Sequence, residues 1–191
     1  SGTFQLNKNE AIHNWYSYIE GYSSRLVSDE LDILKNENIL KVYDPFAGTG
    51  TTPLVASQRG FLSYYSESNP FMLNVIDAKI NSVKSLYSSD VGTKELEKFL
   101  ILLKSVPFHQ DFSINDYGGF EKYYEPTVLN DLIYCKKMIA EVKDVNSRKI
   151  LMIALSSLAV KTSKMIRRGD LRYATIKEKP ELVFDVQKLL S

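Results

Sequence analysis

The segment from Asp44 to Thr52, with the sequence DPFAGTGTT, constrains the fold of this chain more than any other. It follows an apolar run, Ile39–Tyr43, that indicates a buried strand. It precedes Pro53–Arg59, a short predicted helix that Gly60 ends. Strand, glycine loop and helix in this order are typical of a turn that binds a nucleotide-like ligand.

The two glycines and the residues after them predict how this turn is built. Gly48 and Gly50 lack a Cβ, so the backbone can turn tightly and a ligand can lie against it. Thr52 suits the N-cap and Pro53 the first helical position, so we expect the helix to begin at the loop. Its free N–H groups would then face the ligand.

The residues around the loop indicate which ligand it holds. No Gly-Lys-Ser/Thr ends the loop, which excludes a P-loop, and the third glycine of a dinucleotide fingerprint is missing. Glu67 ends a second predicted strand that starts at Phe61, where a carboxylate can accept hydrogen bonds from both ribose hydroxyls. Asp44 either caps the loop or adds negative charge near the ligand. These features favour S-adenosylmethionine, which carries a sulfonium, an ammonium and a ribose.

The same residues carry a resemblance to a known family. Asp44–Thr52 resembles the cofactor motif of DNA amino-methyltransferases, which methylate adenine N6 or cytosine N4, and Glu67–Phe71 is similar to their second motif. Tyr16–Ser23 resembles the segment that closes over the methionine end of the cofactor. The resemblance implies an S-adenosylmethionine site made of Tyr18, Ile19, Asp44, Phe46, Ala47, Gly48, Thr49, Gly50, Thr51, Thr52, Glu67, Ser68 and Asn69.

The catalytic motif of that family is missing. It reads Asp/Asn/Ser-Pro-Pro-aromatic, and this chain contains no Pro-Pro. We therefore assign no catalytic residue, and we expect the motif downstream or on a second chain. The function we expect is the cofactor-binding portion of a site-specific DNA amino-methyltransferase of a restriction-modification system, inactive alone. The alternative is a non-catalytic S-adenosylmethionine-binding subunit or regulatory protein.

A basic segment near the end of the chain is the candidate DNA contact. Lys161, Lys164, Arg167, Arg168 and Arg172 are its cations, and Met165–Tyr173 resembles a stretch ahead of the catalytic motif in some of these methyltransferases. They either form a solvated helix end or contact DNA phosphates. The resemblance favours DNA for Arg167, Arg168 and Arg172. The expected partners are thus DNA and the rest of the methyltransferase, or a second copy of the chain.

Composition limits the remaining classes. The net charge of +1 over 191 residues does not indicate a dedicated nucleic-acid-binding domain. One cysteine excludes an internal disulfide and suits the cytoplasm, and Cys135, within a helical pattern, is expected in the core. No residue cluster with metal-ligand spacing is evident, and no membrane-spanning run is present.

Periodicity predicts an α/β fold, a partial Rossmann-like methyltransferase fold with a large helical segment after the second strand. We expect a cofactor-binding unit over 3–84 and a mainly helical region over 85–191. Loops are expected over 85–90 and, with basic residues, over 167–179; residues 105–125 are expected to be irregular. Helices are expected at about 24–36, 71–84, 93–104, 126–142, 146–164 and 183–190.

Overall fold

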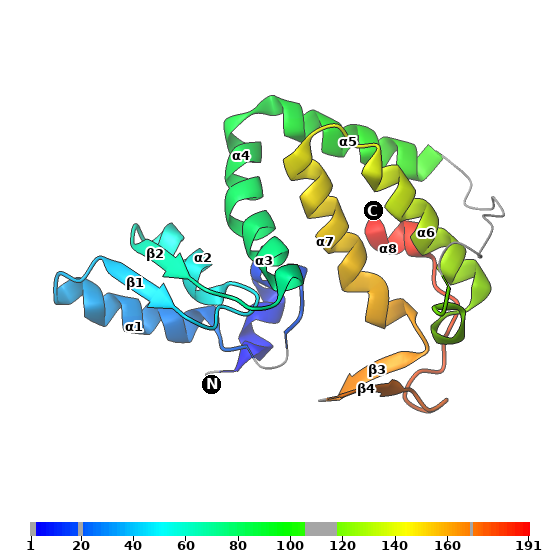
Figure 1. Cartoon of the computed structure of the whole chain (residues 1–191), viewed down its shortest axis with the longest axis horizontal. Coiled ribbons are helices and arrows are strands. Elements are labelled where there is room, and N and C mark those ends of the chain that lie inside the picture. The colour runs from blue at the N-terminus through cyan, green and yellow to red at the C-terminus, as the bar shows by residue number, and fades with distance from the viewer. Residues whose placement is uncertain (1–2, 19–20, 106–117, 169) are drawn as a thin grey trace. The chain divides into compact units, whose positions relative to one another are not determined.

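A computed structural model describes residues 3–18, 21–105, 118–168 and 170–191 of the chain. The chain divides into two compact units, Ser1–Ser88 and Ser89–Ser191 (Figure 1). Most of the segment expected to be irregular lies outside the described residues, as does the candidate cofactor residue Ile19.

The first unit is built around a strand-helix-strand motif. β1 (Lys41–Asp44) and β2 (Leu62–Tyr65) pair in parallel, with Lys41 opposite Leu62 and Asp44 opposite Tyr65, and α2 (Thr51–Gln58) connects them. The predicted strand, glycine loop, helix and strand are confirmed, although both strands are shorter than expected. The first strand is not buried as predicted, because Lys41 and Tyr43 are exposed. The predicted helix 24–36 is also confirmed as α1 (Ser24–Asn36), whose Ser23 side chain accepts a hydrogen bond from Leu26 N.

The small sheet is covered by helices on one face. Val27 and Leu31 of α1 pack with Val55 and Ala56 of α2 and with Phe61, and Val42 of β1 lies against this cluster. On the other face, Tyr43 and Tyr64 are lateral partners that stay 61% and 53% exposed. Parallel sheets normally have both faces buried, so this face lacks its usual cover within the first unit.

A long helical segment follows β2. It consists of α3 (Pro70–Asp77), a π-helical turn labelled η3 (Ala78–Ser82) and α4 (Val83–Ser88). The expected cap is confirmed, because Asn69 Oδ1 accepts a hydrogen bond from Phe71 N and Pro70 is in the first turn. The expected loop over 85–90 is wrong: the stretch contains no glycine or proline, and the helix continues to Ser88. Two short 3₁₀ helices, η1 (Phe4–Asn9) and η2 (His13–Trp15), precede α1 within the unit.

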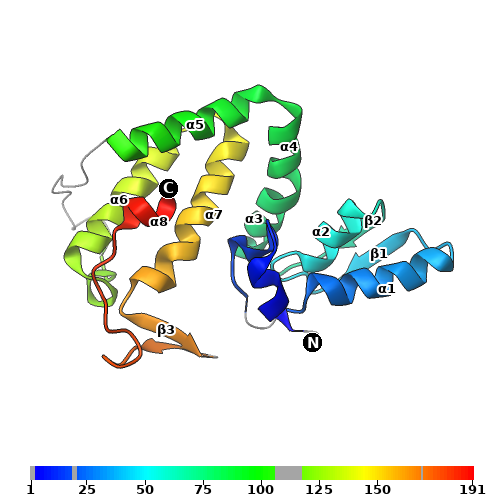
Figure 2. The ribbon, with the colours of Figure 1, turned by 180° about the vertical axis from the view of Figure 1, so that it is seen from behind.

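The second unit is mainly helical. Its helices are α5 (Asp90–Ser105), α6 (Pro126–Ala140), α7 (Val145–Thr162) and the short α8 (Val186–Leu190), and a 3₁₀ turn η5 (Glu121–Tyr123) precedes α6. Figure 2 shows α8 against α6 and α7. The shared core contains Phe99 and Leu103, Val128 and Ile139, Leu151 and Leu155, and Val186. Cys135 is fully buried there, as predicted, and burial raises the pKa of its thiol to about 12.

Three helix starts in this unit differ from the expected ones. α5 begins at Asp90 rather than Thr93, and α8 begins at Val186 rather than Val183. α7 begins at Val145, because the Asp144 carboxylate accepts a hydrogen bond from Ser147 N and so caps the helix one turn before Ser147. An aspartate is as good a cap as a serine, and the sequence does not decide between them.

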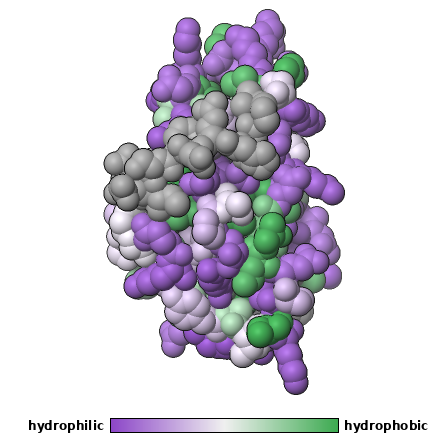
Figure 3. Space-filling view, turned by 90° about the vertical axis from the view of Figure 1, so that its right-hand side faces the viewer, coloured by the Kyte–Doolittle hydropathy of each residue, from purple (hydrophilic) through white to green (hydrophobic). Residues whose placement is uncertain are grey.

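The predicted basic loop over 167–179 is wrong for its first part, up to Tyr173, while 174–179 contains no helix or strand, as predicted. β3 (Met165–Arg168) pairs antiparallel with β4 (Asp170–Tyr173), so that Met165 is opposite Tyr173 and Arg167 is opposite Leu171. The basic residues thus stand on an ordered hairpin. Over the face of the molecule in Figure 3, most side chains are hydrophilic and the hydrophobic ones form small groups. None of the described helices is long and apolar enough to span a membrane.

The architecture is mixed α/β with a small parallel sheet. Among the described residues the two sheets have two strands each, β1 with β2 and β3 with β4. This is consistent with part of a methyltransferase fold, because the strand-loop-helix-strand motif of such folds is present. The long helices after β2 confirm the predicted helical segment.

Candidate functional site

The loop between β1 and α2 depends on its two glycines. Gly48 has φ of +53° and Gly50 has φ of +82°, a region in which side chains with a Cβ are strained. A Cβ on Gly48 would lie 3.1 Å from Cε1 of Tyr18, and one on Gly50 would lie 2.9 Å from Cγ1 of Ile76. Gly50 N donates to Ala47 O at 2.7 Å and closes the turn. Both positions therefore require glycine for conformation and for space.

The helix after the loop starts two residues earlier than predicted. Thr51 is the first residue of α2 and Gly50, in the left-handed conformation, is the N-cap. The Thr52 hydroxyl is instead hydrogen-bonded to the Tyr22 hydroxyl at 2.5 Å, so it does not cap the helix. Pro53 is then the third helical residue, which it can be because the first N–H groups of a helix have no partner inside it.

Asp44, at the end of β1, stabilises the start of the loop through hydrogen bonds to its carboxylate. Its Oδ1 accepts a hydrogen bond from Phe46 N at 3.0 Å and its Oδ2 accepts one from the Tyr22 hydroxyl at 2.7 Å. Burial raises the pKa of Tyr22 to about 12; the bond to Thr52 opposes this rise, and the carboxylate of Asp44 adds to it. Asp44 is therefore the loop cap that the sequence left as one of two alternatives.

Glu67, after the end of β2, connects the two halves of the site. Its Oε2 accepts a hydrogen bond from Gly48 N at 2.8 Å, and its Oε1 accepts one from Asn69 N at 2.9 Å. A carboxylate has about four acceptor positions, so each oxygen can accept a further hydrogen bond. The carboxylate thus bridges the glycine loop and the start of α3 and can still bind a ligand hydroxyl.

An open pocket lies beside Glu67. It has a volume of about 280 Å³ and is lined by Pro45, Phe46, Ser66, Glu67 and Ser68. The Phe46 ring is 85% exposed and offers an apolar surface, while Tyr43 and Ser66 share a hydrogen bond of 2.7 Å between their hydroxyls. A flat apolar ring next to a carboxylate is a chemically suitable environment for a nucleoside, with its base and its ribose hydroxyls.

Six of the predicted cofactor residues fall into two groups, those that line the pocket and those whose side chains are buried under the loop. Phe46, Glu67 and Ser68 line the pocket. Ala47, Thr49 and Thr51 are buried, so their side chains support the loop from inside.

The segment before α1 lies close to the loop. The Tyr18 ring lies so close to Gly48 that a Cβ there would be 3.1 Å from it, nearer than ordinary van der Waals contact. Tyr16 packs edge-to-face against Phe71 of α3, with ring centroids 5.1 Å apart. Asn7 accepts a hydrogen bond from Ser24 N at 2.8 Å and so ties η1 to the start of α1. The segment that carries Tyr16 and Tyr18, referred to as the aromatic segment, is therefore anchored near the glycine loop.

Sequence reasoning missed Lys79. This lysine of η3 is only 2% exposed, and its Nζ donates to Thr49 O at 3.1 Å and to His13 O at 3.4 Å. Burial lowers its pKa to about 8. Burial, and then the charge of Lys79, lower the pKa of His13, whose buried Nδ1 has no hydrogen-bond partner within the described part of the chain. The one available signal was a lysine inside the apolar stretch Val75–Ile80.

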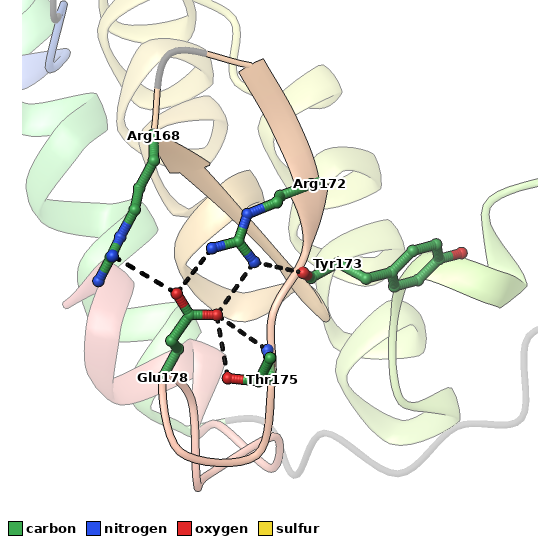
Figure 4. Close-up of polar contacts among 5 residues, drawn as sticks. All are labelled: Arg168, Arg172, Tyr173, Thr175 and Glu178. Atoms are coloured by element: carbon green, nitrogen blue, oxygen red, sulfur yellow. Dashed lines mark hydrogen bonds and ion pairs between the residues drawn. The ribbon is translucent and has the colours of Figure 1, made fainter.

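The candidate DNA residues are on the β3–β4 hairpin, and two of them are already paired. The Arg172 guanidinium donates to both oxygens of Glu178, at 2.7 and 3.0 Å, and Arg168 lies 3.6 Å from the same carboxylate (Figure 4). Thr175 also donates to Glu178 through its N–H and its hydroxyl. These contacts, that of Arg172 first, lower the pKa of Glu178 to about 2.

Arg167 is exposed, and it has no ion pair among the residues that the structure describes. Lys164, another cation of the predicted basic run, pairs with Glu125 at 2.9 Å. The hairpin therefore offers fewer unpaired cations than its sequence suggests. Its exposed aromatic residue Tyr173 stacks on Tyr123 with ring centroids 6.0 Å apart.

The comparisons with known proteins give a partial similarity to one kind of enzyme. Over 64 residues the chain is 47% identical to "Type II methyltransferase M.BsoBI" of Geobacillus stearothermophilus. This alignment covers 32% of this chain and 12% of that protein. Over 77 residues it is 29% identical to "Type II methyltransferase M.AvaI" of Nostoc sp., which covers 40% of this chain and 16% of that protein. The matched part is thus less than a fifth of each relative's length. No family model matches, and no solved structure matches.

Proposed function

We propose that the first unit binds S-adenosylmethionine in the pocket beside the glycine loop. The observation that carries this proposal is the position of Glu67, whose carboxylate reaches the loop amide of Gly48 while lining the pocket with Phe46. This arrangement presents an acceptor for ribose hydroxyls and an apolar ring for a base. A binding turn without a phosphate-binding lysine and with two acidic residues suits a cationic nucleoside better than a pyrophosphate.

We further propose that the chain is the cofactor-binding portion of a DNA amino-methyltransferase of a restriction-modification system. Two lines support this: the resemblance of Asp44–Thr52 and Glu67–Phe71 to the motifs of that family, and the similarity to relatives named Type II methyltransferases. The target is adenine N6 or cytosine N4. The catalytic Pro-Pro-aromatic motif is supplied by downstream sequence or by a second chain.

DNA is the proposed substrate, and the β3–β4 hairpin is its proposed contact. Arg167 is exposed there. Arg168 and Arg172 pair with the carboxylate of Glu178, and a DNA phosphate oxygen would take the place of that carboxylate on binding. Because the chain lacks the catalytic motif, we expect no tritiated methyl transfer to DNA by the 191-residue chain above a control without protein. Methyl transfer by this chain would contradict the proposal that the catalytic motif is supplied by downstream sequence or by a second chain.

The ribose contact can be tested by comparing two ligands. S-adenosylhomocysteine and its 2′-deoxy analogue are titrated calorimetrically into the wild-type chain and into Glu67→Ala. If Glu67 accepts the ribose hydroxyl, the deoxy analogue binds the wild type about tenfold more weakly, since a hydrogen bond to a charged group is lost. In Glu67→Ala both ligands bind weakly and about equally.

Glu30→Ala is the matched control for this comparison. Glu30 is an exposed acid on α1 and lies outside the pocket lining, so the control should keep the wild-type ratio of the two affinities. A ratio that is unchanged in Glu67→Ala would exclude the ribose contact. A folded wild-type chain that binds neither ligand, or that prefers NAD, would contradict the cofactor assignment itself.

A further inference from the structure

The π-helical turn η3 places a lysine where an α-helix of this sequence would not be expected to bury one. The segment from Val75 to Ile80 is apolar except for Asp77 and Lys79, and Val75, Ile76 and Ala78 are fully buried. A π turn inserts an extra residue into the helical ladder, which changes the direction of the side chains in it. Such turns occur often at functional sites.

The surroundings of the Lys79 ammonium are unusual for a buried cation. Its two hydrogen-bond acceptors are backbone carbonyls, those of Thr49 and His13, and no carboxylate lies within ion-pair distance of it in the described ranges. Burying a charge without a counter-ion costs free energy, so this lysine is a poor means of stabilising the fold. Its two contacts point to a different use.

One of the two carbonyls belongs to the glycine loop, and the other belongs to the segment before α1 that lies close to this loop. Thr49 is the residue between Gly48 and Gly50, and because these glycines lack a Cβ, the backbone on both sides of Thr49 can rotate more freely than at other residue types. Fixing the Thr49 carbonyl fixes the peptide plane that also carries the Gly50 N–H, and this N–H closes the turn on Ala47 O.

His13 belongs to η2, which leads into Tyr16 and Tyr18. These aromatic residues contact Phe71 and the Gly48 position. One ammonium group therefore joins the glycine loop to the aromatic segment beside it, although the three residues are far apart in the sequence.

We propose that Lys79 is a positioning residue for cofactor binding: it holds the carbonyl of Thr49 and the carbonyl of His13 and so sets the conformation of the glycine loop and of the aromatic segment together. The proposal rests on the proposed function for the identity of the ligand. The order of the loop without ligand does not depend on that identity and is measured separately.

The test uses the full 191-residue chain with Lys79→Met, which keeps the length and apolar character of the side chain and removes its donors. Amide hydrogen exchange is measured by mass spectrometry without ligand. Peptides covering 10–16 and 45–52 should exchange about tenfold faster in Lys79→Met, because a contact to a charged donor is lost. Peptides of α6 and α7 should not change. Lys84→Met, the same change at an exposed lysine of α4, is the control and should match the wild type.

Affinity for S-adenosylhomocysteine is measured on the same proteins. Lys79→Met should bind about tenfold more weakly with an unchanged or higher melting temperature, while Lys84→Met binds normally. Unchanged exchange of the two segments, a uniform increase over the whole chain, or a Lys79→Met protein that fails to fold would each overturn the proposal. If the wild type binds no cofactor but Lys79→Met still loosens both segments, the proposed function fails and the positioning of the loop stands.

Discussion

Gly50 and Gly60 have nearly the same backbone conformation and very different surroundings. Their φ angles are +82° and +80°, but a Cβ on Gly50 would meet Ile76, whereas nothing lies within 4 Å of a Cβ on Gly60. Ile76 is fully buried and cannot easily move. The pair therefore separates backbone strain from steric clash at single residues.

We expect Gly50→Ala to lower the free energy of unfolding by about 3 kcal/mol, the sum of left-handed strain and overpacking. Gly60→Ala should cost only about 1 kcal/mol, because it adds strain without a clash. Urea denaturation measures both. Equal losses in the two variants would show that the contact between α3 and the loop is not tight.

Lys79 also predicts a pH dependence. Its pKa is about 8 in the folded chain, below its ordinary value of 10.5, so the unfolded chain binds more protons between these two values. Wild-type stability relative to Lys79→Met should therefore rise from pH 8 to pH 10.5, by on the order of 3 kcal/mol. His13, whose pKa is lowered, is neutral throughout this range. Denaturant unfolding at several pH values gives the difference, and a constant difference would exclude the shift.

At the scale of elements, the β3–β4 hairpin brings two cations of a basic sequence to one carboxylate, that of Glu178. Glu178 pairs with Arg172 and, at a longer distance, with Arg168, so among the described residues Arg167 is the cation of β3 without an ion pair. Binding of a phosphate to Arg172 requires the release of Glu178. The hairpin should thus bind DNA more weakly than its formal charge implies.

Duplex DNA binding at low salt tests this arrangement. Arg167→Ala should weaken binding and reduce the slope of log affinity against log salt by about 1, because one phosphate contact is lost. Glu178→Gln should strengthen binding, since it frees Arg168 and Arg172. Arg25→Ala, an exposed arginine of α1, serves as the control. The DNA assignment is wrong if Arg167→Ala and Arg25→Ala bind alike and Glu178→Gln has no effect.

Elements with strong local signals could be predicted from the sequence. The apolar run before Asp44, the glycines and the Asn69-Pro70 pair gave β1, the loop and the start of α3. The hairpin could not be predicted, because its strands have four residues each and exposed arginines hide their alternation. The π turn and the contact of Lys79 with Thr49 depend on tertiary packing, which a local pattern does not record.

The candidate site also combines residues with a local sequence signal and contacts that depend on tertiary packing. Glu67 and the glycines belong to a motif, so the sequence predicts them as candidate site residues. The role of Tyr22 as the donor to Asp44 depends on a contact between residues 22 positions apart, for which no spacing rule exists. Likewise, the basic run does not reveal that Arg172 pairs with Glu178, which is six residues further along the chain.

At the scale of the whole molecule, the first unit has a sheet face without its usual cover. Tyr43, Leu62 and Tyr64 are exposed on it, and two strands alone do not make a stable parallel sheet. This supports the expectation that the chain pairs with the remaining part of the methyltransferase or with a second copy. The resulting prediction concerns the isolated chain.

We expect light scattering to show self-association of the isolated chain, driven by this face. Tyr64→Lys places a charge on the face and should shift the chain towards the monomer. Tyr87→Lys, at a tyrosine that is 89% exposed on α4, is the control and should leave the association unchanged. A wild-type chain that is a well-folded monomer without any partner would contradict the expectation.

An NMR titration of the ¹⁵N-labelled chain with S-adenosylhomocysteine tests whether the glycine loop and Glu67 bind S-adenosylmethionine. We expect saturable shifts of the amides of Gly48, Gly50, Ser68 and Asn69, with the amides of α5 to α8 unchanged. A titration in which these amides do not shift while the chain stays folded, or in which NAD shifts them at lower concentration, would contradict this expectation.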